Sequence, residues 1–130
     1  MATRVRALGE IALRVSDLPR ARRFYDTVLG LDLLGEFPHA VFYRIGPVCA
    51  GHTQAFVLFD RSAPVNAGAS TLDHVAFTIH LTDFEPERER LEALGLTVRV
   101  TQHAWVQWRS LYIQDPDGNQ VEFVCHDPSL

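Results

Sequence analysis

The chain has 130 residues, of which 47% are hydrophobic and 22% are charged, and its formal net charge is −4 at pH 7. These values are typical of one globular domain that buries an apolar core of its own. A nucleic-acid partner is disfavoured because the sequence has no basic stripe. A membrane span is disfavoured because no apolar run approaches the roughly 18 residues that a span needs.

The two cysteines, Cys49 and Cys125, form neither a CxxC motif nor a disulfide framework. We interpret them as reduced thiols that behave as small buried side chains. The basic start of the chain, residues 1–6, is not followed by the apolar stretch of a signal peptide. The sequence therefore predicts a cytoplasmic protein.

The first half of the chain predicts one strand, one helix and three further strands. Residues 10–15 alternate between apolar and other side chains, so they predict a half-buried strand with Glu10 on the face away from the core. Apolar side chains at helical spacing predict a helix over residues 18–29, with Asp17 as its N-cap and Gly30 just past its end. Strand-like runs follow at residues 31–35, 40–45 and 54–59.

The second half repeats this order after residues 61–71, whose small, polar, Pro- and Gly-containing sequence predicts a linker. A strand is predicted over residues 73–80. A helix begins at a capping box formed by Thr82 and Glu85 and continues to Leu94. Three strands end the chain, at residues 96–102, 107–114 and 120–126.

The two halves also resemble each other in sequence. Residues 8–15 match residues 72–79, and the match places Glu10 and His74 at the same position of a strand. Both side chains are able to bind a metal. Because matching strands of a duplicated chain can converge on one cavity, we expect the chemistry where the halves meet.

Three motifs resemble the vicinal oxygen chelate superfamily: residues 15–31, residues 73–77 and the closing motif at residues 115–124. This superfamily contains glyoxalases, extradiol dioxygenases, epimerases, fosfomycin-resistance enzymes and bleomycin-resistance binding proteins. The resemblance extends over residues 8–126, almost the whole chain.

The predicted eight short strands and two helices indicate an α+β fold. The resemblance implies that they form one vicinal-oxygen-chelate domain, residues 1–130. Two βαβββ modules, at about residues 6–60 and 72–126, are expected to form a cup-shaped eight-stranded mixed sheet with two main helices. The resemblance also implies a homodimer, although nothing in the sequence indicates which strand edge would pair.

In the resembling enzymes a divalent metal lies in the cup, with ligands from the first and last strands of both modules. Carried over by position, the resemblance places Glu10, His74 and Glu122 at three of the four ligand positions. Strand alternation independently places these side chains on the faces opposite the apolar ones. One imidazole and two carboxylates suit Zn, Ni, Mn or Fe. The alternatives are that His74 is a structural histidine, that Glu10 is a carboxylate at the rim of the cup, and that Glu122 is a solvated strand residue.

The fourth ligand position departs from the pattern of the superfamily. Aligning the last strands of the two modules sets Ala55 opposite Glu122, and alanine cannot coordinate a metal. Gln54, shifted into place by a one-residue bulge, is our preferred ligand, with His52 on the same strand face as the alternative. A water molecule in this position would leave an open site of the catalytic kind.

The last third of the chain offers candidate substrate contacts. Alternation places Trp108 and Tyr112 on one strand face and Leu111 and Ile113 on the other, so the first two would form an aromatic wall of the cup. The alternative is that these aromatic side chains complete the core or a dimer interface. Arg109 is a candidate contact to an anion.

The function implied by the resemblance is a glyoxalase-like, metal-dependent lyase or isomerase. Its small substrate would bind the metal through two neighbouring oxygens, with Glu122 as the first candidate for the base and Glu10 as its partner. A metal-free protein that binds a drug or natural product is the alternative. It is favoured by Ala55, which stands at a predicted ligand position and cannot bind a metal. A dioxygenase is the third hypothesis, disfavoured because its iron needs two histidines and one carboxylate.

Overall fold

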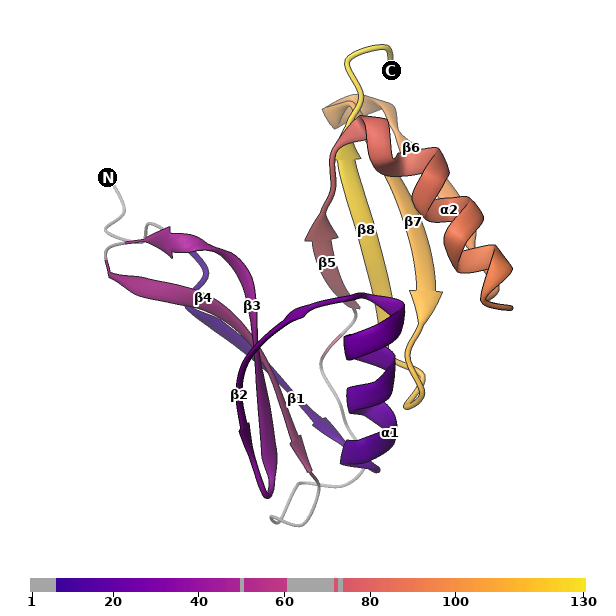
Figure 1. Ribbon diagram of the computed structural model, residues 1–130. Coiled ribbons are helices and arrows are strands. Elements are labelled where there is room, and N and C mark those ends of the chain that lie inside the picture. Colours follow the sequence, from indigo (N-terminus) through magenta and orange to yellow (C-terminus); the bar gives the residue numbers. More distant parts are fainter. Residues whose placement is uncertain (1–6, 50, 61–71, 73) are drawn as a thin grey trace. The chain divides into compact units, whose positions relative to one another are not determined.

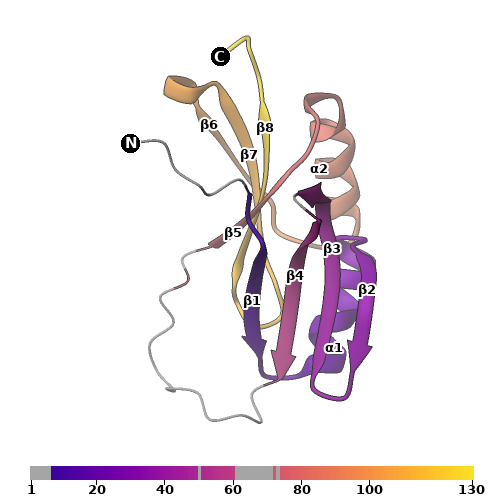
Figure 2. The ribbon, with the colours of Figure 1, turned by 90° about the vertical axis from the view of Figure 1, so that its left-hand side faces the viewer.

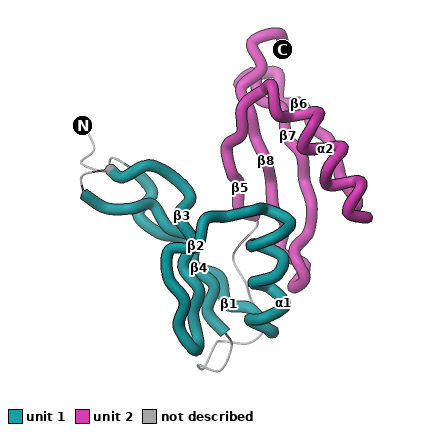
Figure 3. Tube along the Cα trace, in the orientation of Figure 1, with its two compact units in different colours: residues 1–67 teal, residues 68–130 magenta. Residues whose placement is uncertain are grey.

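The computed structural model describes residues 7–49, 51–60, 72 and 74–130 (Figure 1). Contacts divide the chain into two compact units, Met1–Ala67 and Gly68–Leu130, here called module one and module two (Figure 3). The predicted linker, residues 61–71, lies outside the described residues. None of the helices in the described ranges has the length and hydrophobicity that crossing a bilayer requires.

Module one is a four-stranded sheet with one helical segment. Its strands lie side by side in the order β1-β4-β3-β2, as Figure 2 shows, with β1 parallel to β4 and the other pairs antiparallel. The elements are β1 (Glu10–Val15), α1 (Leu18–Arg23), a π-helical turn (Phe24–Val28), β2 (Asp32–Phe37), β3 (Ala40–Cys49) and β4 (His52–Asp60).

Module two repeats this topology in the order β5-β8-β7-β6, with β5 parallel to β8. Its elements are β5 (His74–Thr78), a 3₁₀ turn (Leu81–Asp83), α2 (Phe84–Ala93), β6 (Arg99–His103), a second 3₁₀ turn (Ala104–Val106), β7 (Trp108–Gln114) and β8 (Gln120–His126). The predicted α+β class with two βαβββ modules is therefore confirmed. The eight strands of the described ranges form two hydrogen-bonded sheets of four, not one sheet of eight.

The helix of module one begins and ends as predicted, but its second half is π-helical. The Asp17 carboxylate accepts a hydrogen bond from the backbone N–H of Arg20 at 3.0 Å, and Gly30 follows the helix with a φ of +67°. The helix buries Tyr25 against Tyr43 and Phe56 of the sheet, with ring centroids 6.5 and 4.8 Å away. This aromatic cluster forms the core of module one.

The predicted start of α2 is wrong. The helix begins at Phe84 after the 3₁₀ turn, and its N-cap, Asp83, makes no side-chain capping hydrogen bond, so no capping box at Thr82 and Glu85 starts it. Phe84 must enter the core of module two, where it is 2% exposed, and this burial sets where the helix begins. Leu91, seven residues later on the same face of α2, is fully buried as well.

Alternation along the strands is confirmed in both modules. Leu13 and Val15 of β1 are buried while Glu10 is exposed, and Leu111 and Ile113 of β7 are buried while Trp108 is 46% exposed. One face of each sheet therefore carries the core and the other carries the candidate functional side chains.

Gly95 ends α2 with a φ of +85°, in the left-handed region that side chains with a Cβ disfavour. A Cβ at this position would meet no atom within 4 Å. We therefore expect Gly95→Ala to destabilise the protein by about 1–2 kcal/mol through backbone strain alone. Urea unfolding measures this, and Gly95→Asn is the control, because asparagine tolerates this region better and should lose less. Equal losses in the two variants would contradict the explanation.

Candidate functional site

The side chains of His74 and Glu122 meet on neighbouring parallel strands of module two. Nε2 of His74 lies 3.0 Å from Oε1 of Glu122, and their side chains are 36% and 8% exposed. His74 begins β5 and pairs in register with Gln120, so its ring reaches Glu122 two residues along β8. The carboxylate is buried, while the imidazole remains open to solvent on one side.

The other oxygen of the Glu122 carboxylate is bound by a serine. The hydroxyl of Ser110, fully buried on β7, donates a hydrogen bond to Oε2 of Glu122 at 2.6 Å. Both carboxylate oxygens therefore have a partner, which a buried charged group requires. Sequence reasoning assigned Ser110 no role, although strand alternation puts this small polar residue on the face of Trp108 and Tyr112, and that was the available signal.

Tyr112 lies beside this pair. It pairs in register with Glu122, and its ring lies edge-on to that of His74 with centroids 6.4 Å apart. Its hydroxyl is 3.3 Å from Nε2 of His103, and the guanidinium of Arg99 covers its ring at 4.1 Å. Trp108 shares the sheet face but pairs with His126, at the far end of β8.

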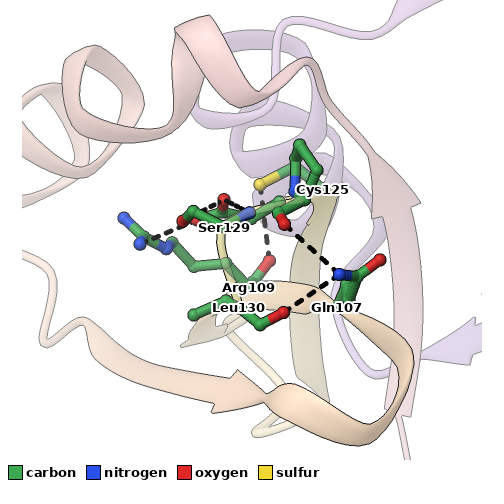
Figure 4. Close-up of polar contacts among 7 residues, drawn as sticks. Gln107, Arg109, Cys125, Ser129 and Leu130 are labelled. Atoms are coloured by element: carbon green, nitrogen blue, oxygen red, sulfur yellow. Dashed lines mark hydrogen bonds and ion pairs between the residues drawn. The ribbon is translucent and has the colours of Figure 1, made fainter.

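The structure does not bring Arg109 to this cluster. Arg109 lies on the other face of the sheet, where its Nη2 is 2.8 Å from Oδ2 of Asp127 and its guanidinium lies 5.2 Å from the ring of Phe84. The carbonyl of Arg109 also lies 3.6 Å from the buried thiol of Cys125 (Figure 4). Strand alternation accounts for this, since Arg109 follows Trp108 directly. Burial raises the pKa of the Cys125 thiol.

Strand pairing in module one corrects the predicted fourth ligand position. Ala12 pairs with Val57, whereas the equivalent Ala76 of module two pairs with Glu122. The counterpart of Glu122 is therefore Val57, not Ala55, because the register is set by the parallel partner strand and not by the similarity of the preceding turns. Val57 is fully buried and cannot coordinate a metal.

Gln54 and His52 do not lie on the strand face of Glu10. Glu10 pairs in register with Ala55, so alternation directs Gln54 and His52 to the opposite face. The amide of Gln54 donates a hydrogen bond to the carbonyl of Pro47 at 3.1 Å, within the sheet. The ring of His52 lies beside Gly9, 3.8 Å from where a Cβ on that residue would stand.

The donor chemistry of the site fits part of a metal centre. Within the described residues, neither module gathers three His, Cys, Asp or Glu side chains into a cluster able to hold a metal ion. Module two supplies an imidazole nitrogen and a carboxylate oxygen in contact, and the carboxylate is oriented by Ser110. Such a pair provides two of the three or four protein ligands that a divalent ion needs. Further ligands must come from elsewhere, and exposed Glu10 of module one is the sequence candidate.

We expect Ser110→Ala to destabilise the protein by about 1–3 kcal/mol, because it leaves an oxygen of the buried Glu122 carboxylate without its hydrogen bond. Urea unfolding of the single variants and the double variant measures the coupling between the two side chains. In a Glu122→Leu background the same serine change should be neutral or stabilising, because the buried hydroxyl has already lost its partner. A loss of equal size in both backgrounds would contradict the assigned contact.

Asp127 provides a prediction on pH. Hydrogen bonds from the Ser129 hydroxyl and backbone N–H, reinforced by Arg109, hold the pKa of Asp127 below its ordinary value of 3.8. The ionised carboxylate therefore contributes stability above that pH, and the contribution is lost as the pH falls through the lowered folded-state pKa. Asp127→Asn should unfold at lower urea than the wild type at pH 7 and converge with it in acid. Asp83→Asn, at an exposed carboxylate, is the control; a difference independent of pH would refute the assignment.

Comparison with known proteins agrees with this architecture. The chain is 32% identical over 124 residues to the glutathione transferase FosA of Serratia marcescens, covering 91% of this chain and 79% of that protein. A lactoylglutathione lyase structure from Agrobacterium tumefaciens has a TM-score of 0.68 and 28% identity, covering 92% of each chain.

A second solved structure, an integron cassette protein from the mobile metagenome of a Halifax Harbour sewage outfall, has a TM-score of 0.73 and 26% identity. It covers 93% of this chain and 99% of that one. Residues 7–123 match the sequence profile of a single family, and this range includes β1 through most of β8 with His74, Ser110 and Glu122. The chain belongs to the Glyoxalase/Bleomycin resistance protein/Dioxygenase superfamily.

Proposed function

We propose that the protein is a metal-dependent enzyme whose divalent cation is held by His74 and Glu122 of module two. Glu10 stays a predicted further ligand. The observation that carries the proposal is the contact of 3.0 Å between the His74 imidazole and the Glu122 carboxylate, on the sheet face that α2 leaves open. A buried carboxylate is expensive unless it is paired or coordinated, and this one faces a partly exposed imidazole.

A Zn, Ni, Mn or Fe ion bound there would act as a Lewis acid toward a small substrate with two neighbouring oxygens. Ser110 fixes Oε2 of Glu122 and so directs Oε1 toward His74 and the open face. Because both oxygens of Glu122 are engaged, its role as a ligand is better supported than its role as a base. The sequence predicts Glu122 as the first candidate for the base and Glu10 as its partner, and we keep both as candidates for moving a proton.

For the reaction itself we propose a glyoxalase-type lyase or isomerase, supported by the likeness to the lactoylglutathione lyase. Transfer of a thiol such as glutathione is the second candidate, and the 32% identity to the glutathione transferase FosA favours it. A metal-free binding protein is the third candidate, because module one carries the apolar Val57 at the position equivalent to the proposed ligand Glu122. A dioxygenase is disfavoured because His74 supplies one imidazole where that chemistry uses two.

The small-molecule substrate, the homodimer and the cytoplasmic location remain predictions. The apolar strand edge of module one is compatible with a second subunit, since Leu33, Leu34 and Phe37 of the edge strand β2 are 42–58% exposed.

The metal content of the purified protein tests the proposal. Protein prepared without chelator should carry close to one equivalent of a divalent metal by elemental analysis. His74→Ala and Glu122→Gln should each lower the affinity for that metal by more than about tenfold. The matched controls, His80→Ala and Glu89→Gln, change exposed residues outside the sheet and should leave the affinity unchanged.

Wild-type protein that neither carries nor takes up Zn, Ni, Mn or Fe would refute the metal site. If that protein instead bound bleomycin with quenching of tryptophan fluorescence, the binding-protein alternative would be supported. For the metal-loaded enzyme, consumption of the hemithioacetal of methylglyoxal and glutathione indicates a glyoxalase-type reaction. Consumption of fosfomycin only when glutathione is present indicates thiol transfer.

A further inference from the structure

We infer that the site accepts a substrate that carries an anionic group, a carboxylate or a phosphonate, which Arg99 recognises beside the metal-binding oxygens. This inference rests on the proposed function and specifies the substrate class of the same site. It is carried by the position of Arg99 in the sheet, by its contacts and by the cavity it lines.

Arg99 stands in the same row of the sheet as Glu122. Glu122 pairs with Tyr112, and Tyr112 pairs with Arg99, so the three residues occupy adjacent strands β8, β7 and β6 on one face. Two strand spacings separate the backbones of Arg99 and Glu122 by about 10 Å. Tyr112 lies between them in this row. Its ring centroid is 4.1 Å from the guanidinium carbon of Arg99 and 6.4 Å from the ring centroid of His74.

The guanidinium of Arg99 is held in place without a carboxylate. It stacks over the ring of Tyr112, and its Nη1 donates a hydrogen bond to Oγ1 of Thr101 at 3.0 Å. Stacking keeps the planar fork of donors oriented for bidentate contact with an oxyanion.

The other arginines described in module two all pair with acids. Arg88 pairs with Glu85 and Glu92, Arg90 with Glu87, and Arg109 with Asp127. Within the described part of the chain, Arg99 forms no such ion pair. Its positive charge is therefore available to a ligand.

The cavity next to Arg99 has the size and polarity for such a ligand. Its volume is about 510 Å³, and Arg99, Tyr112, Gln114 and Gln120 line it together with Ile113 and residues 95–97, which follow α2. Arg99 is the charged side chain of this lining, which includes no acid among the described residues. His74 and Glu122 are not among its lining residues, but Gln120 pairs in register with His74 and Tyr112 with Glu122, so the cavity lies next to the residues that flank the proposed ligands. A cavity of this volume accommodates a small molecule whose acidic end lies at Arg99.

The test measures binding of three matched probes to protein loaded with Mn²⁺ by isothermal titration calorimetry. 2-Oxoglutarate and 2-oxo-4-phosphonobutanoate carry a distal acid, and 2-oxopentanoate has the same chelating end without it. The wild type should bind at least one acidic probe roughly tenfold more tightly than 2-oxopentanoate. Whichever acidic probe binds more tightly shows whether the site prefers a carboxylate or a phosphonate. Arg99→Gln should remove the preference for the acidic probe over 2-oxopentanoate, whereas Arg99→Lys should retain part of it.

Arg88→Gln removes an equal charge from the outer surface of α2 and should keep the preference. An unchanged preference in Arg99→Gln, an equal loss in Arg88→Gln, or no preference in the wild type would overturn the inference. Titration with Mn²⁺ alone precedes these measurements and separates the two proposals. Failure to bind the metal refutes the proposed function, whereas metal binding without acid preference refutes only the role of Arg99.

Discussion

The candidate site depends on a carboxylate that module two buries and holds by both oxygens. A glutamate that is 8% exposed in the middle of a strand would be strongly unfavourable if its charge were left alone. The Ser110 hydroxyl and the His74 imidazole supply the missing contacts from the strands on either side. Because the parallel pair β5–β8 and the antiparallel pair β7–β8 set these positions, the topology of the module itself brings the three side chains together.

The duplicated architecture explains why the two modules differ at this position. Strand order and pairing are the same in both, yet the position that carries Glu122 in module two carries buried Val57 in module one. Module one thus uses that strand for apolar packing, while module two uses it for a charged group. The repeat conserves the backbone pairing and lets individual side chains on equivalent strands take different roles.

Much of the fold was predictable from hydrophobic alternation, because side chains with a period of two define both faces of a half-buried strand. The same alternation correctly placed Tyr112 and Glu122 on the face away from α2. Register was not predictable: it depends on pairing between distant strands, and the similar turns before β4 and β8 led to Ala55 where the structure has Val57. The start of α2 was mispredicted because burial of Phe84 outweighed a local capping signal.

The role proposed for Arg99 depends on strand pairing, which the sequence alone does not reveal. In the sequence it is one arginine among twelve basic residues, and nothing in its neighbours marks it for binding. In the sheet it stands one strand beyond Tyr112, and the aromatic ring connects it to His74 through contacts on both sides. The stacked arginine forms no ion pair among the described residues, whereas its paired counterparts on α2 are already neutralised by neighbouring acids. A charge that the folded module leaves uncompensated, beside a cavity, is therefore better explained by a ligand than by the stability of the sheet.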